Sequence, residues 1–199
     1  MNKIIKCLVN KISEYNPEFS DLELKKMEYG LICTFSEITK FVPYFIIFWI
    51  FSLHKYYIVS IIFFCPIRLF SGGYHAKTYW GCFFISLAVF AGIAIIGKYI
   101  ILNKYILMLL LIFSFAIVCI FSPVDNVNKR IKSKERRLKL RNCSIIITLC
   151  LSILCYFIQG EFFNTAAISI VSAVIMMMVG KINNIFSFQL TSDFNNKKI

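Results

Sequence analysis

Long, unbroken apolar runs dominate the chain, and short polar stretches separate them. A helix needs about 20 apolar residues to cross a bilayer, and in lipid the backbone polar groups must be satisfied within helices or closed barrels. The runs are solid rather than alternating, which favours helices over a barrel. The pattern therefore predicts an all-α, polytopic helical membrane protein with about six transmembrane helices, at residues 31–53, 56–69, 80–97, 104–121, 143–158 and 162–182.

The boundary between the first two runs is the weakest point of this pattern. Only Ser52, Leu53, His54 and Lys55 interrupt the apolar sequence there, and the second run is short. The two runs are therefore predicted either to cross the membrane separately or to form a re-entrant hairpin.

Residues 1–30 differ from the rest of the chain and predict an N-terminal amphipathic, interfacial segment. Within residues 1–16 the apolar side chains share one helical stripe, with lysines elsewhere. Ser20 and Glu23 have the spacing of a capping box, so a second helix is expected to begin at Asp21. We expect this segment at the membrane surface, with a soluble partner-binding arm as the alternative. Residues 1–199 are expected to form a single membrane-embedded domain.

The chain is strongly basic, with 22 Lys and Arg residues against 10 Asp and Glu residues and a formal net charge of +12. The cations lie between apolar runs, where they orient spans and meet anionic lipid headgroups, so the charge does not indicate nucleic-acid binding. The densest cluster, residues 129–141, is expected to be a basic cytoplasmic loop. Counting crossings from it places residues 68–82 and both termini in the cytoplasm of a multi-pass cell-membrane protein.

The eight cysteines show no CxxC pair and no metal-ligand spacing. Most lie inside apolar runs, where a thiol is an ordinary small apolar filler. We therefore expect no disulfides, no metal and no cofactor.

The segment between the second and third runs, RLFSGGYHAKTYWGC at residues 68–82, is the strongest candidate for chemistry. His75 can accept and return a proton near neutral pH, and Cys82 can act as a nucleophile. Together they are the minimum set for cysteine-based acyl transfer. The alternative is an interfacial histidine and a core cysteine, because free cysteines are common in buried positions.

A continuous helix cannot join these two side chains. They are seven residues apart, which is about 10.5 Å along a helix at ~1.5 Å per residue. The chain must therefore fold back between them, and Gly72 and Gly73 permit such a path. Thr78 can cap a helix that begins near Tyr79, which places Cys82 in the first turn, where the helix dipole favours negative charge.

This segment resembles the signature of the AgrB family, the membrane peptidases that process quorum-sensing propeptides. The family pattern falls on Arg68, Gly72, Gly73, Tyr74, His75, Ala76 and Cys82. A second stretch, SPVDNVNK at residues 122–129, and the flanking apolar runs are also similar to the family. The chain departs from the family at Arg130, where a proline is common. The resemblance implies that Cys82 is the nucleophile and His75 the general base.

The resemblance also implies a substrate and an outcome. The substrate is expected to be an AgrD-like propeptide with an amphipathic leader and an acidic C-terminal tail. The tail is removed through a Cys82 acyl-enzyme, and the product cyclises to a thiolactone or lactone autoinducing peptide. The family also suggests a homodimer. The rival class is a non-enzymatic membrane peptide exporter, which six spans and a basic face would suit equally.

Further residues are expected to bind substrate or to support the catalytic pair: Arg68, Gly72, Gly73, Lys77, Asp125, Asn128, Lys129 and Arg130. The candidates for orienting His75 are Asp125, Glu37 and a backbone carbonyl. The Gly72 and Gly73 N–H groups are candidates for stabilising the oxyanion. The basic cluster is expected either to recognise the acidic tail or to anchor the chain on anionic lipid.

Overall fold

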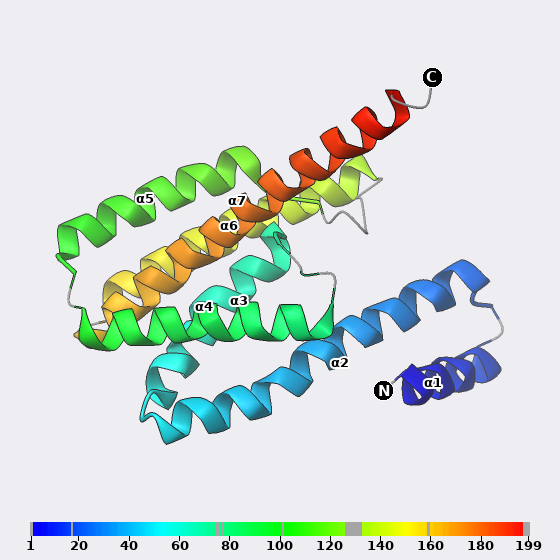
Figure 1. The fold of residues 1–199 in the computed structure, drawn as a ribbon, viewed down its shortest axis with the longest axis horizontal. Coiled ribbons are helices and arrows are strands. Elements are labelled where there is room, and N and C mark those ends of the chain that lie inside the picture. Colours follow the sequence, from blue (N-terminus) through cyan, green and yellow to red (C-terminus); the bar gives the residue numbers. More distant parts are fainter. Residues whose placement is uncertain are drawn as a thin grey trace. The chain divides into compact units, whose positions relative to one another are not determined.

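The computed structural model describes residues 2–16, 18–74, 76, 78–100, 102–125, 133–158 and 160–196, apart from the side chains of residues 2–4, 29, 33 and 187–196. This part of the chain is helical, which confirms the predicted fold class (Figure 1). The helices are α1 (Asn2–Tyr15), α2 (Asp21–Ile50), α3 (His54–Ser71), α4 (Tyr79–Tyr99), α5 (Lys104–Phe121), α6 (Lys134–Phe157) and α7 (Glu161–Asn196). The chain divides into residues 1–47 and residues 48–199, described separately as unit 1 and unit 2.

Within the described residues, five helices are long and apolar enough to cross a membrane, where the sequence predicted about six: α2, α4, α5, α6 and α7. The remaining predicted span is present as α3, a helix of 18 residues. His54, Lys55 and Arg68 lower its mean hydropathy, and α3 packs against α4, α6 and α7. The chain is a multi-pass membrane protein, and α3 is the predicted span that is not among these five helices.

Unit 1 confirms the predicted start of a helix at Asp21. The Ser20 N–H donates to Glu23 Oε2 (3.0 Å) and the Glu23 N–H donates to Ser20 Oγ (3.4 Å), which is a reciprocal capping box. In α1, Ile5 and Val9 lie one turn apart and are buried, as expected for an amphipathic helix. The interfacial location of this segment stays a prediction.

Helix α7 is the centre of unit 2. It contacts α3, α4, α5 and α6, and Figure 1 shows α5 and α6 alongside it. Small side chains let membrane helices approach one another closely, and α7 buries several small residues: Ala166, Ala167, Ser169, Ala173 and Gly180. The position of α7 therefore determines how the other four helices pack.

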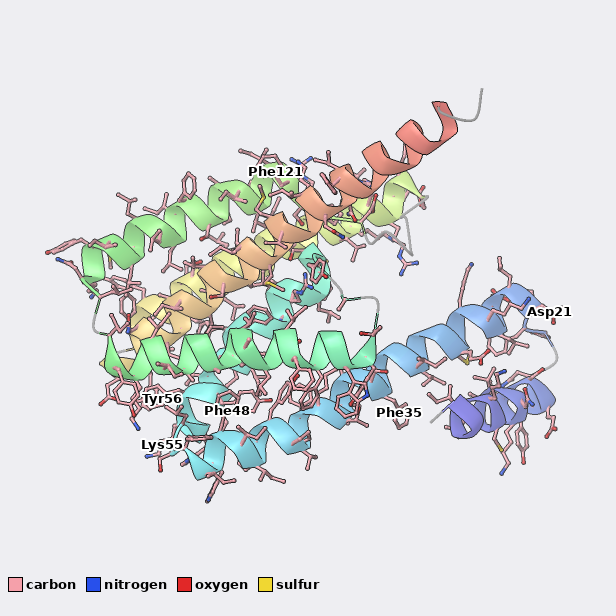
Figure 2. All side chains as sticks on the ribbon, viewed as in Figure 1. Asp21, Phe35, Phe48, Lys55, Tyr56 and Phe121 are labelled. Atoms are coloured by element: carbon pink, nitrogen blue, oxygen red, sulfur yellow. The ribbon has the colours of Figure 1, made fainter. Side chains whose placement is uncertain are left out.

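Unit 2 has two ends. The last turns of α3 and α5 and the first turns of α4 and α6 lie at one of them, on the right in Figure 1. We call this the loop end and define it by residues 71–78 and 122–125. The opposite end holds the first turns of α3, α5 and α7 and the last turns of α4 and α6. Among the residues labelled in Figure 2, Phe121 lies at the loop end, and Lys55 and Tyr56 lie at the opposite end.

The sequence predicted the basic cluster, residues 129–141, to be a loop, but only part of it can be one. Helix α6 begins at Lys134, so residues 134–141 are helical, while residues 126–132 lie outside the described residues. The Ser133 side chain caps this start by accepting from the Arg136 N–H (3.4 Å). Because Lys, Arg, Leu and Glu are good helix formers, the helix of the span continues through the basic residues.

Candidate active site

Two glycines end α3 and turn the chain into the first loop. The Gly72 N–H donates to the Arg68 carbonyl (3.2 Å) and caps the helix. Gly72 and Gly73 have φ angles of +73° and +137°, which favour glycine. A Cβ on Gly72 would also overlap the Val124 carbonyl oxygen. This path of the loop therefore requires glycine at both positions.

The two sequence motifs meet through their backbones. The Val124 N–H donates to the Ser71 carbonyl (2.8 Å), and Gly72 and Val124 form an isolated parallel bridge. Val124 is buried in a cluster with Val118, Val174 and Met177. The two loops therefore lie at the same end of the helices, as an even number of spans between them requires. The side of the membrane stays a prediction.

The Arg68 side chain supports the first loop. Its Nη1 donates to the Gly72 carbonyl (2.8 Å) and its Nη2 donates to the Tyr74 carbonyl. A Cβ on Gly73 would overlap Nη1, so the guanidinium fills the space beside this glycine. Arg68 thus holds the loop backbone, and its contact with substrate stays a prediction.

Cys82 lies in the first turn of α4. The Thr78 side chain accepts from the Gly81 N–H (3.1 Å) as the N-cap, and the Cys82 N–H donates to the Thr78 carbonyl (3.0 Å). This confirms the predicted start of the helix at Tyr79. The Cys82 side chain is half-buried, and its thiol is not in a disulfide. The candidate nucleophile therefore lies where the positive end of the helix dipole favours an anion.

His75 and Lys77 lie outside the described residues, so the His75–Cys82 pair stays a prediction. The chain beside His75 is described at Ala76. A Cβ placed on Gly81 would lie 3.3 Å from the Ala76 Cβ. The chain next to His75 thus folds back against the first turn of α4, which the spacing of the predicted pair requires.

Asp125 is the last residue of the second loop, residues 122–125, and it contacts two helices. Its carboxylate forms an ion pair with Arg137 of α6, and its carbonyl accepts from Asn184 Nδ2 of α7. Neither partner was expected from the sequence. The other predicted members of this group lie outside the described residues: Asn128, Lys129 and Arg130.

Sequence reasoning also missed the contribution of α7. The Tyr74 N–H donates to the Met176 carbonyl (3.2 Å), and Gly180 lies against Gly73. The signal for Gly180 was a lone glycine inside an apolar run, because such a glycine usually has a packing reason. Nothing in the sequence indicated which segment it would contact.

The loop end brings a thiol, a helix start and polar backbone groups together at the boundary of the apolar helices. Of these groups, the thiol is the one that can act as a nucleophile once a base has accepted its proton. Across the described residues, no group of three or more His, Cys, Asp and Glu side chains is placed to hold a metal ion.

Comparison with known proteins places the chain in a family. Residues 2–180 match the family model of Accessory gene regulator B. A protein of Clostridium beijerinckii described as AgrB-like is 29% identical over 181 residues, which cover 88% of this chain and 89% of that protein. No solved structure matches. Because the family match runs through both loops of the site, the chain belongs to the AgrB family, and membership implies the processing of an AgrD propeptide.

Proposed function

We propose that this chain is a membrane cysteine endopeptidase that removes the C-terminal tail of an AgrD-like propeptide. Cys82 is the nucleophile and His75 is the general base. The observation that carries the proposal is the position of Cys82 in the capped first turn of α4, beside a loop that folds back toward that turn. Family membership supports the substrate class.

The first step forms an acyl-enzyme. His75 takes the proton of the Cys82 thiol, and the sulfur attacks the carbonyl carbon of the scissile peptide bond. The tetrahedral intermediate then breaks its C–N bond, and the leaving amine of the tail receives the proton from His75. The tail departs, and the rest of the propeptide stays on Cys82 as a thioester.

The second step closes a ring. An internal Cys or Ser of the propeptide attacks the thioester carbonyl, and its proton passes through His75 to the departing Cys82 sulfur. Attack by a thiol exchanges one thioester for another and yields a thiolactone, whereas attack by a hydroxyl yields a lactone. Water would hydrolyse the thioester instead, so a site sheltered at the bilayer boundary suits the reaction.

The oxyanion of the tetrahedral intermediate needs hydrogen-bond donors. The sequence suggested the N–H groups of Gly72 and Gly73, but the Gly72 N–H donates to the Arg68 carbonyl. We therefore propose the Gly73 N–H as the remaining donor of this pair. The Gly81 and Cys82 N–H groups at the start of α4 already bond to Thr78, so this helix start contributes through its dipole, which favours negative charge.

Replacement of each member of the pair tests the mechanism. In lipid nanodiscs, Cys82→Ala and His75→Ala should release no tail from a synthetic AgrD-type propeptide, as followed by mass spectrometry. Cys143→Ala should keep the wild-type rate, and it is the matched control because Cys143 is also a half-buried thiol. Tail release at the wild-type rate by correctly inserted Cys82→Ala would falsify the mechanism. A peptide exporter, the alternative class, would release no tail even as the wild-type protein.

The loop end is proposed to face the cytoplasm, because the basic residues lie there. Lys134 and Lys104 are exposed and each begins a helix, the first at the loop end and the second at the opposite end. In a background without native cysteines, a membrane-impermeant maleimide outside intact cells should label Lys104→Cys and spare Lys134→Cys. The reverse pattern would invert the topology. The homodimer suggested by the family resemblance stays a prediction.

The basic cluster at residues 129–141 is the proposed site for the acidic tail of the propeptide. Arg137 already pairs with Asp125, and Arg141 donates to the Cys119 carbonyl (2.9 Å). These two cations therefore make contacts within the protein. The cations proposed for the tail are Lys129, Arg130 and Lys132. Neutralising these three should raise KM for the propeptide more than it lowers kcat. An unchanged KM in correctly inserted protein would leave only lipid anchoring as their role.

A further inference from the structure

One stretch of α7, residues 176–184, lies against both loops of the site. The Tyr74 N–H of the first loop donates to the Met176 carbonyl (3.2 Å). Further along the helix, Asn184 Nδ2 donates to the Asp125 carbonyl of the second loop. Between them, Lys181 Nζ lies 3.7 Å from the centroid of the Phe121 ring, at the end of α5. Both loops are therefore positioned by the same part of α7.

Gly180 is a point where α7 and the first loop touch backbone to backbone. It is buried, and a Cβ placed there would overlap the Gly73 carbonyl carbon and the Tyr74 nitrogen and lie 2.7 Å from the Gly73 Cα. Carbon atoms pack at about 3.5–4.0 Å. Backbone atoms cannot rotate away as the end of a side chain can, so any side chain at residue 180 must move the loop.

The contact is reciprocal. A Cβ on Gly73 would lie 2.9 Å from the Met176 carbonyl oxygen, which is the oxygen that accepts from the Tyr74 N–H. In an α-helix the carbonyl of residue 176 points toward residue 180, so a side chain at 180 would stand beside this acceptor. Glycine at both positions is what lets the loop N–H reach the helix.

Helix α7 also packs against the helix that carries Cys82. Along the α4–α7 contact, a Cβ on Gly97 would lie 3.0 Å from the Thr165 Cβ and overlap its hydroxyl oxygen. The first loop and α4 thus both pack against α7, and this α4 contact lies 15 residues along the helix from Cys82. A shift of the loop along α7 is therefore a shift of the loop relative to Cys82.

We propose that Gly180 and the Met176 carbonyl form a positioning site for the catalytic loop. They set where Tyr74, and with it the adjacent His75, is held relative to Cys82. This inference rests on the proposed function, since it concerns the geometry of the His75–Cys82 pair. Gly180 touches no reacting atom and acts through the loop. Because misplacing a catalytic group by about 1 Å can cost about 100-fold in rate, a small shift is sufficient.

The test compares alanine at three helical glycines. Gly180→Ala adds a methyl group against the loop, and Gly97→Ala adds one against Thr165 at the opposite end. Gly92→Ala, also in α4, adds one where no heavy atom lies within 4 Å. The measurements are insertion, thermal unfolding, kcat and KM with the synthetic AgrD-type propeptide, and the rate of Cys82 alkylation by iodoacetamide in a background lacking the other cysteines.

Gly180→Ala should lower kcat by about 10- to 100-fold while KM stays within about twofold of wild type. Alkylation of Cys82 should slow as well, because the base is displaced from the thiol. Gly97→Ala should lower the unfolding temperature and leave kcat and the alkylation rate of the inserted protein unchanged. Gly92→Ala should match the wild-type protein in all of these measurements.

A second variant keeps the test decisive if Gly180→Ala fails to insert. Replacing Tyr74 by its α-hydroxy acid analogue removes the N–H that bonds to Met176 and adds no bulk, and it should lower kcat in the same way. A wild-type kcat in either variant, or an equal loss of kcat in inserted Gly97→Ala, overturns the positioning role. Failure of the proposed function would look different, because either Cys82→Ala would still release the tail or the wild-type protein would release none.

Discussion

The two ends of unit 2 are joined by different kinds of contact. At the opposite end, side chains close the helix ends. Asn164 Nδ2 of α7 donates to the carbonyls that end α4, and the Tyr56 hydroxyl donates to the Glu161 carboxylate, which joins α3 to α7. Removing such a side chain removes a contact and leaves the backbone path of regular helices in place.

At the loop end, side chains such as Arg68 and Asn184 also make contacts, but backbone atoms bond directly to backbone atoms of other elements. The Val124 N–H bonds to the Ser71 carbonyl, and the Tyr74 N–H bonds to the Met176 carbonyl. Glycine makes these approaches possible, so an added atom moves the chain instead of merely weakening a contact. The comparison predicts that mutations at the opposite end lower stability, whereas mutations at the loop end lower the rate of the inserted protein.

The largest difference is expected between two glycines with positive φ, Gly73 at the loop end and Gly160 at the opposite end. Gly73→Ala should lower tail release by more than about 100-fold, because its Cβ would overlap the Arg68 guanidinium. Gly160→Ala has no heavy atom within 4 Å of its Cβ, so it should cost only about 1–2 kcal/mol of unfolding free energy. Equal losses of kcat in the two inserted proteins would remove the distinction between the ends.

Arg68 and Asn164 provide the next comparison, since each donates to backbone carbonyls at one end. Arg68→Ala should lower kcat by about 10- to 100-fold, and Arg68→Lys should not restore it, because an ammonium lacks the planar fork that bonds two carbonyls. Asn164→Ala should cost about 1–3 kcal/mol of unfolding free energy and keep kcat. Steady-state cleavage and thermal unfolding in nanodiscs measure both, and a wild-type kcat in Arg68→Ala would contradict the supporting role.

The helix caps Thr78 and Asn103 give a smaller, closely matched pair. The Thr78 side chain accepts from the Gly81 N–H (3.1 Å), and Asn103 Oδ1 accepts from the Tyr105 N–H (2.9 Å). Each alanine substitution should cost about 1 kcal/mol of unfolding free energy. Only Thr78→Ala should also lower kcat, by several-fold, because α4 carries Cys82 in its first turn. Thr78→Ser, which keeps the hydroxyl, should restore the rate.

The smallest effect is expected at the partly exposed ion pair between Asp125 and Arg137. Asp125→Asn and Arg137→Gln should each change the unfolding free energy by at most about 1 kcal/mol, and the change should shrink as salt screens the pair. Comparing the two variants also tests whether Asp125 orients His75. If it does, Asp125→Asn alone should lower kcat and alter its pH profile, whereas equal and small effects would leave Asp125 as a structural residue.

Much of the fold could be predicted because local signals determine it. Apolar composition identified the helices, and caps at Ser20 and Thr78 placed the starts of α2 and α4. The basic cluster was predicted less well. Its cations are polar, which favoured a loop, but they are also good helix formers, and α6 runs through them from Lys134.

The site could be predicted only in part, for a physical reason. His75 and Cys82 carry functional groups, which a sequence displays directly. The bridge from Gly72 to Val124 and the contact of Gly180 with the first loop depend on the absence of side-chain atoms and join residues far apart in the chain. A missing Cβ indicates that something comes close, but it does not indicate which segment does.

The amide hydrogens of Tyr74 and Val124 lie in irregular segments, yet they bond to carbonyls of α7 and α3. Loop amides usually exchange with deuterium through local openings of low free energy. These two can open only when the first loop leaves α7 or the second loop leaves α3, so they should exchange on the slow timescale of the helices. A deuterium-labelling map should therefore show protection at two isolated loop positions beyond the helix ends. Such protection would show that the rigid part of the protein includes these loop residues.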